Sequence, residues 1–232
     1  MQKLERVVVL FSGVALALSG CGGSAKKVDP AADLRVAKSA VLVAADVPSG
    51  FTGTPHTNSD DLPASAKKAF AECMHADATL FDDTPGAQKA DSADFKKGDD
   101  EIDSSVEIDP KKKDIDKGYE QMAQSQTPAC LGQLFDSAIK SSAGSQPGVT
   151  YGTVKVTRAS VTGIGDRGFT FSGTIPITAQ SQALTFYFDV LLVQRDRAGI
   201  TISTFQTNAP LDHDTELRLV RTVVDRVGDG AK

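Results

Sequence analysis

The segment from Leu184 to Val193 constrains the fold most, because it is apolar at almost every position. Side chains alternate between the two faces of a β-strand, so Phe186 and Phe188 fall on one face and Tyr187 and Leu191 on the other. A strand that is apolar on both faces must be covered on both faces. The sequence therefore predicts a sheet with further structure packed against each side.

The hydrophobic period changes near Val149 and indicates the fold class. Before this point apolar residues recur at helical spacing, and after it they alternate with polar residues between glycine-rich turns. The pattern predicts an α+β fold, a curved antiparallel sheet packed against helices. The last four strands are expected to form an antiparallel meander near residues 153–157, 169–177, 184–193 and 200–206.

Helices are predicted both before and after this meander along the chain. The expected helices are one capped by Asp33, one over 62–74, one near 115–124, one from the Thr127 cap to Gly144, and one from Asp212 or Asp214 to Gly228. The acidic stretch 91–109 has loosely alternating apolar residues. It predicts one or two edge strands with a polar outer face.

The first residues form a signal-peptide pattern. Lys3 and Arg6 precede an apolar run over 7–18, which is shorter than the roughly 18 residues of a membrane-spanning helix. The run ends in Leu18-Ser19-Gly20-Cys21, which resembles the lipobox of bacterial lipoproteins. The resemblance implies cleavage before Cys21, acylation of that cysteine with chains such as palmitate, and a location on the extracytoplasmic face of the cell membrane.

The domain organisation follows from this assignment: a signal peptide over 1–20, a lipidated flexible tether over 21–32 and a single α+β domain over 33–232. Two other interpretations were weighed, an ordinary signal peptide with Cys21 as a structural thiol and a short buried helix. The small residues that follow Cys21 argue against both. Cleavage would leave 23 basic and 29 acidic residues, so nucleic acid is excluded as a favourable partner.

Cys73 and Cys130 are the cysteines that remain once Cys21 carries lipid. In an oxidising compartment they are predicted to form a disulfide between two helices, and closing a loop of this length is worth about 4 kcal/mol. Two buried free thiols are the alternative. Metal binding is disfavoured, because there is no CxxC motif and the three histidines are scattered.

The sequence has few patterns that are typical of a catalytic site. Ser65 with Lys68 and Ser137 with Lys140 match Ser-x-x-Lys without the companion motifs of that enzyme class, so exposed helix residues are the simpler interpretation. His56, His75 and His213 are far apart, and His213 is expected at a helix start.

The acidic run over 99–109 could attract calcium, but it lacks the order of an EF-hand loop. A solvated edge of the sheet explains it better. We therefore predict no catalytic residue, no cofactor and no metal site.

The order of features resembles the sensor-type lipoproteins of actinobacteria, which are related to the extracellular domain of a mycobacterial serine/threonine kinase. The matching segments are Leu42 to Phe51, Phe70 to Cys73, Thr127 to Leu131 and the final strand and helix. The resemblance implies a sandwich like PsbP and Mog1, with a helix-lined cleft for ligand sensing or envelope-protein contacts. This chain has one candidate disulfide where the kinase domain has two, and no kinase part, so ligand residues do not transfer.

The expected function is that of a non-enzymatic, membrane-anchored sensor module that binds an envelope lipid or small molecule. A protein-interaction or assembly factor for envelope transport is the alternative, and an enzyme is a third. The first predicts an apolar pocket, the second an exposed apolar patch and the third clustered titratable groups with shifted pKa values.

Overall fold

The computed structural model describes residues 28–56, 64–77, 84–143, 149–179, 182–228 and 230–231. These residues form an α+β fold with a large antiparallel sheet and five helices, which confirms the predicted fold class. The helices are α2 (Pro30–Ala40), α3 (Ala64–Cys73), α4 (Lys112–Met122), α5 (Thr127–Ala143) and α6 (His213–Val227). The strands are β1 (Thr52–Thr54), β2 (Gln88–Asp91), β3 (Asp94–Lys97), β4 (Asp100–Ile108), β5 (Val149–Tyr151), β6 (Lys155–Val161), β7 (Arg167–Ala179), β8 (Gln182–Arg195) and β9 (Ala198–Thr207).

The sheet has the order β1-β3-β4-β9-β8-β7-β5, with β2 beside β4 and β6 beside β7. Strands β6 to β9 pair with their sequence neighbours, which confirms the antiparallel meander. A two-residue turn at Asp196 and Arg197 joins β8 to β9, and Asp196 takes a left-handed backbone conformation with φ 51°. The predicted boundaries of these strands differ from the observed ones by a few residues.

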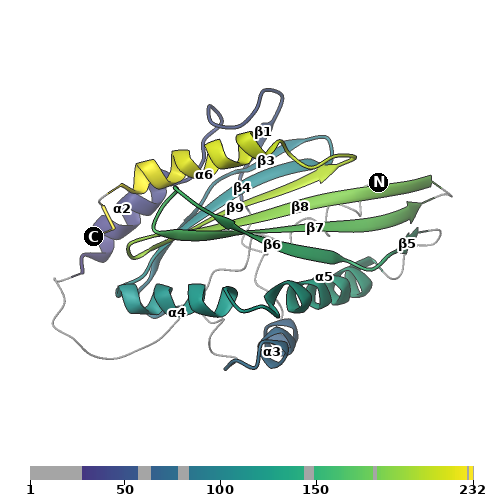
Figure 1. Cartoon of the computed structure of the whole chain (residues 1–232). Coiled ribbons are helices and arrows are strands. Elements are labelled where there is room, and N and C mark those ends of the chain that lie inside the picture. The colour runs from purple at the N-terminus through teal and green to yellow at the C-terminus, as the bar shows by residue number, and fades with distance from the viewer. Residues whose placement is uncertain are drawn as a thin grey trace.

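Helices cover both faces of the sheet (Figure 1). Helices α2 and α6 lie on one face, and α3, α4 and α5 lie on the other. Strand β8 contributes to both layers: Phe186 and Phe188 pack toward α3, α4 and α5, whereas Leu191 and Val193 pack toward α2 and α6. The prediction that this strand is covered on both faces is confirmed.

The first described helix begins earlier than predicted. Asp29, not Asp33, caps α2, because its side chain accepts hydrogen bonds from the amides of Ala31 and Ala32, and Pro30 occupies the first helical position. Asp33 lies inside the first turn and forms an ion pair with Arg197. The predicted cap at Asp33 is therefore wrong, and α2 includes residues that the sequence assigned to the tether.

The acidic segment is also different from the prediction. It forms β3 and β4, and β4 lies inside the sheet between β9 on one edge and β2 and β3 on the other. Glu101, Asp103 and Glu107 are each 7% exposed, so they do not form a solvated edge. Burial follows from the internal position of β4, and Lys96 lies 3.4 Å from the Glu101 carboxylate.

Two other helix starts refine the predictions. The Asp212 side chain accepts a hydrogen bond from the amide of Thr215, so Asp212 rather than Asp214 caps α6. The hydroxyl of Thr127 does not cap α5; it is fully buried and donates to the carbonyl of Gln121 at the end of α4. Gly144, the predicted end of α5, lies outside the described residues. Among the helices described, none combines the length and apolar character required to cross a membrane.

Candidate functional site

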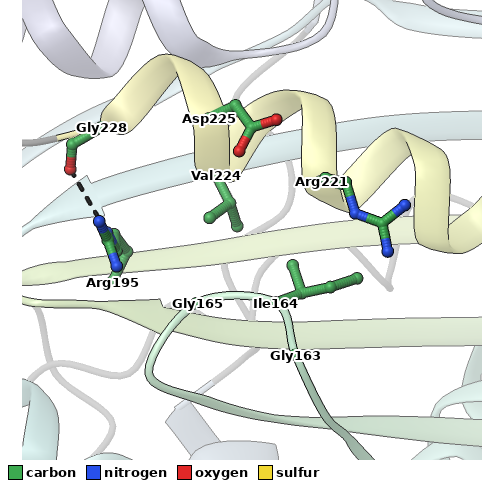
Figure 2. A pocket seen from close by; sticks show the side chains of 8 residues that line it. All are labelled: Gly163, Ile164, Gly165, Arg195, Arg221, Val224, Asp225 and Gly228. Atoms are coloured by element: carbon green, nitrogen blue, oxygen red, sulfur yellow. Dashed lines mark hydrogen bonds between the residues drawn. The ribbon is translucent and has the colours of Figure 1, made fainter.

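An open pocket of about 330 Å³ lies between α6 and the β6–β7 loop (Figure 2). Three parts of the chain line it: the loop between β6 and β7, the end of β8, and the last two turns of α6 with the residue after them. The lining residues are Gly163, Ile164, Gly165, Arg195, Arg221, Val224, Asp225 and Gly228. Val224 and Ile164 lie at its centre, with Arg195 and Arg221 on opposite sides of them (Figure 2).

Two glycines shape the floor of this pocket. Gly163 and Gly165 have φ angles of +74° and +65°, which side chains rarely adopt. A Cβ atom at Gly165 would lie 2.5 Å from the carbonyl oxygen of Gln194, so the loop approaches β8 too closely for any other residue. A Cβ atom at Gly163 would meet nothing within 4 Å, because this position borders open space.

Arg195 is occupied by contacts within the protein. Its Nε donates to the carbonyl oxygen of Gly228 at 3.5 Å, and its guanidinium lies 3.6 Å from the carboxylate of Asp166. A cation at a helix C-terminus offsets the partial negative charge of the last carbonyl groups. Arg195 therefore neutralises the end of α6 and ties it to the sheet.

Arg221 and Asp225 are four residues apart on α6, so their side chains lie on the same face of the helix. Both are exposed, and in the described part of the chain no ion pair or side-chain hydrogen bond engages either of them. The pocket thus presents one cation and one anion from the same helix, both accessible to a ligand.

The pocket lies at the end of the molecule where the chain enters α2. Arg197, two residues after Arg195, forms a bidentate pair with Asp33 in the first turn of α2, with distances of 2.9 and 3.0 Å. Gly230, two residues after Gly228, packs so tightly on Val36 of α2 that a Cβ there would lie 2.8 Å from its methyl group. The pocket and the start of α2 therefore lie at the same end of the sheet.

A second polar group lies under the other end of α6. Burial raises the pKa of Glu216 to about 8, and the nearby Asp189 carboxylate on β8 adds to the increase. Glu216 is 3% exposed, and its Oε1 accepts no hydrogen bond from a described residue. Burial in this position favours the protonated carboxyl group and keeps it away from a substrate in solution.

Asp109 forms a third polar site, at the end of β4. Burial raises its pKa to about 7, the neighbouring Asp114 adds to this, and Thr84 and Arg197 oppose it. Asp109 has no exposed surface. Neither Asp109 nor Glu216 lines the pocket, so the titratable groups with the most perturbed carboxyl pKa values lie away from the accessible site.

The candidate catalytic residues from the sequence do not converge. His56 contacts Asp94 at 2.7 Å, and His213 starts α6 and lies 3.5 Å from Glu216. Lys68 is 72% exposed and pairs with Glu72 on the same helix rather than with Ser65, and Ser137 is exposed on α5. Within the described ranges, no group of three His, Cys, Asp or Glu side chains could hold a metal ion.

Cys73 and Cys130 form the predicted disulfide, which joins α3 to α5. Their Cα atoms are 5.7 Å apart and their sulfur atoms 2.01 Å, within the normal range for such a bond. Cys21, the predicted lipidation site, lies outside the described residues.

Sequence reasoning found the turns that border the pocket but not the pocket itself. Arg221 and Asp225 have no local signature, because an arginine and an aspartate at helical spacing are common on exposed helix faces. No protein-family model matches this sequence, and no curated protein is significantly similar to it.

Proposed function

We propose that this protein is a non-enzymatic binding module, held by lipid on Cys21 at the extracytoplasmic face of the membrane, whose ligand occupies the pocket beside α6. The observation that carries the proposal is the open pocket of about 330 Å³ with accessible charges of both signs. Ligand sites are concave and use a few polar groups to orient the ligand. The PsbP and Mog1 type of sandwich remains part of the proposal, supported by the antiparallel sheet with its helices.

Binding explains the site better than catalysis does. Catalytic acids and bases need a shifted pKa together with contact to the substrate. Here the carboxyl groups with the most strongly raised pKa values, Asp109 and Glu216, are buried outside the pocket. Asp225 is the one carboxylate among the residues that line the pocket, and no serine, cysteine, histidine or lysine lines it beside Asp225.

The surface gives less support to a protein-docking factor. Among the described residues the large apolar side chains that are clearly exposed are Val43, at 50%, and Leu184, at 41%. They belong to separate elements, the loop after α2 and the strand β8. Docking surfaces are normally larger and continuous.

Native mass spectrometry of the protein extracted gently from membranes tests this function. We expect a bound small molecule on the wild-type protein and its loss from Asp225→Trp, because an indole at this exposed rim position would fill the pocket. Asp214→Trp is the matched control, since Asp214 is exposed at the opposite end of the same helix. Equal ligand content in the two variants, or none in the wild type, would overturn the proposal.

A further inference from the structure

We propose that the ligand of this pocket is the head group of a membrane phospholipid that carries a phosphate and a primary ammonium, as in phosphatidylethanolamine, taken from the leaflet that holds the lipid anchor. This inference rests on the proposed function and names the ligand class for the same site. Arg221 would bind the phosphate and Asp225 the ammonium.

The charges of the pocket rim fit a zwitterion better than a simple anion. Arg221 and Asp225 are both exposed and do not pair with each other within 4.0 Å. Residues four apart on a helix have Cβ atoms about 5–6 Å apart, so one small ligand with two charges can contact both side chains. A simple anion bound to Arg221 would be repelled by the neighbouring Asp225.

The rest of the pocket leaves room for such a group without adding charge to it. Arg195 is held by Gly228 and Asp166, so its charge is balanced within the protein. The position of Gly163 borders open space. The two charges on α6 therefore decide which ligand binds.

The position of the pocket brings it close to the membrane surface. Val28, where the described chain begins, is the seventh residue after Cys21. Even a fully extended chain of this length spans at most roughly 25 Å. Because the pocket lies beside the first turns of α2, acyl chains on Cys21 would hold it within reach of lipid head groups.

The net charge of the domain favours a neutral membrane surface. The chain from Cys21 onward has 23 basic and 29 acidic residues, so a strongly anionic bilayer would repel it. A zwitterionic bilayer lacks this repulsion. The net negative charge therefore favours phosphatidylethanolamine over anionic phospholipids as the ligand.

The test uses the acylated protein in vesicles of three compositions: phosphatidylcholine alone, and phosphatidylcholine mixed with either phosphatidylethanolamine or phosphatidylglycerol. The measurement is hydrogen exchange of the amides in the β6–β7 loop and the last turns of α6. We expect protection with phosphatidylethanolamine, and at most weak protection with phosphatidylcholine, whose quaternary ammonium cannot donate a hydrogen bond. Equal protection in all three would overturn the inference.

Three variants identify the groups involved. Arg221→Gln should weaken the response to phosphatidylethanolamine about tenfold, the effect expected for loss of one charge-assisted hydrogen bond. Asp225→Asn should remove the preference for phosphatidylethanolamine over phosphatidylcholine and improve the response to phosphatidylglycerol. Arg35→Gln, an exposed arginine on α2 outside the pocket, should change neither. Unchanged responses in Arg221→Gln and Asp225→Asn would overturn the assignment.

Soluble phosphoethanolamine distinguishes the lipid from a free molecule of the same chemistry. When it is added to the protein in phosphatidylcholine vesicles, we expect weaker protection than the bilayer lipid gives, because the anchor concentrates the pocket at the surface. Equal or stronger protection by the soluble compound would overturn the membrane source. A different ligand in the native mass spectrum, with no response to these lipids, would refute the head-group inference and leave the binding module intact.

Discussion

The two faces of the sheet are held to their helices by different chemistry. Helices α2 and α6 cover an aliphatic layer and are fastened by bidentate ion pairs, Asp33 with Arg197 and Asp46 with Arg226. Helices α3, α4 and α5 cover a layer rich in phenylalanine. A disulfide fastens α3 to α5, and an ion pair of 2.8 Å between Arg167 of β7 and Asp116 fastens α4 to the sheet. Both faces therefore use ion pairs, but the face of α3, α4 and α5 adds a covalent bond, which makes the responses of the two faces to reductant distinct.

The aromatic layer gains its order from ring contacts. Phe135 of α5 meets Phe188 of β8 edge to face with centroids 4.9 Å apart, and Phe186 stacks on Phe205 at 5.1 Å. Such pairs are worth about 0.5–1.5 kcal/mol beyond the area they bury. The aliphatic layer has no such directional contacts among its core residues, so arginines at its margin fix how its helices lie on the sheet.

Loss of the disulfide should give the largest effect. The bond closes a loop with a sequence separation of 57 residues, and replacing both cysteines with alanine should lower the free energy of unfolding by about 4 kcal/mol. Urea denaturation measures this change. Reductant should bring the wild-type protein to the same value and leave the double variant unaffected; a wild type insensitive to reductant would contradict the contrast between the faces.

Breaking the buried ion pair should be nearly as costly on the other face. Arg197→Met leaves Asp33, whose side chain is 5% exposed, without its cation. We expect a loss of about 3 kcal/mol, because an uncompensated buried charge is strongly unfavourable. The double variant Asp33→Asn with Arg197→Met should recover part of the loss in the same urea experiment, and a single variant as stable as the wild type would refute this role.

The pH dependence should also belong to the face of α2 and α6. The folded pKa of Glu216, about 8, lies above 4.5, the ordinary value of a glutamate side chain. Its contribution to stability is therefore complete below the unfolded pKa and is lost as pH rises toward the folded pKa. Glu216→Gln should be more stable than the wild type near the upper end of this range by about 2 kcal/mol, because no charge has to be buried.

Thermal unfolding of the wild type and Glu216→Gln across about pH 5 to 8 measures this effect. Glu120→Gln is a suitable control, since Glu120 is an exposed glutamate on α4. Parallel pH profiles for the wild type and Glu216→Gln would show that Glu216 is not protonated in the folded protein.

A surface ion pair on the disulfide face should give the smallest effect. Lys68 and Glu72 are 72% and 70% exposed and their charged atoms are 3.8 Å apart. Lys68→Ala should change the free energy of unfolding by less than about 0.5 kcal/mol. A larger loss in urea denaturation would contradict the expectation that the disulfide, and not this exposed ion pair, stabilises α3.

The meander and the disulfide were predictable because their signals are local. Alternation marks β8, and two cysteines on apolar helical faces predict their own pairing. The burial of Glu101 and Glu107 was not predictable, because it depends on β9, whose residues follow β4 by about a hundred positions and pair with it only in the folded protein. The ion pair between Asp33 and Arg197 was not predictable for the same reason, because its two residues are far apart in the sequence. With its carboxylate bound to Arg197, Asp33 does not cap α2.

The pocket was beyond prediction for a related reason. Its walls come from a loop, a strand end and a helix that are separate in the sequence, and Arg195 and Arg221 are ordinary residues in their local settings. The sequence does identify the glycines of the β6–β7 loop as a turn. The sequence does not indicate that the end of α6 lies next to these glycines.

Attachment of the folded body through Cys21 underlies both the proposed function and the proximity of the pocket to lipid head groups. Intact-mass and fragment analysis of the protein isolated from its native membrane tests this attachment directly. We predict a chain whose first residue is Cys21, with a diacylglyceryl group on its sulfur. A chain that retains residues 1–20, or in which Cys21 carries a free thiol, would contradict it.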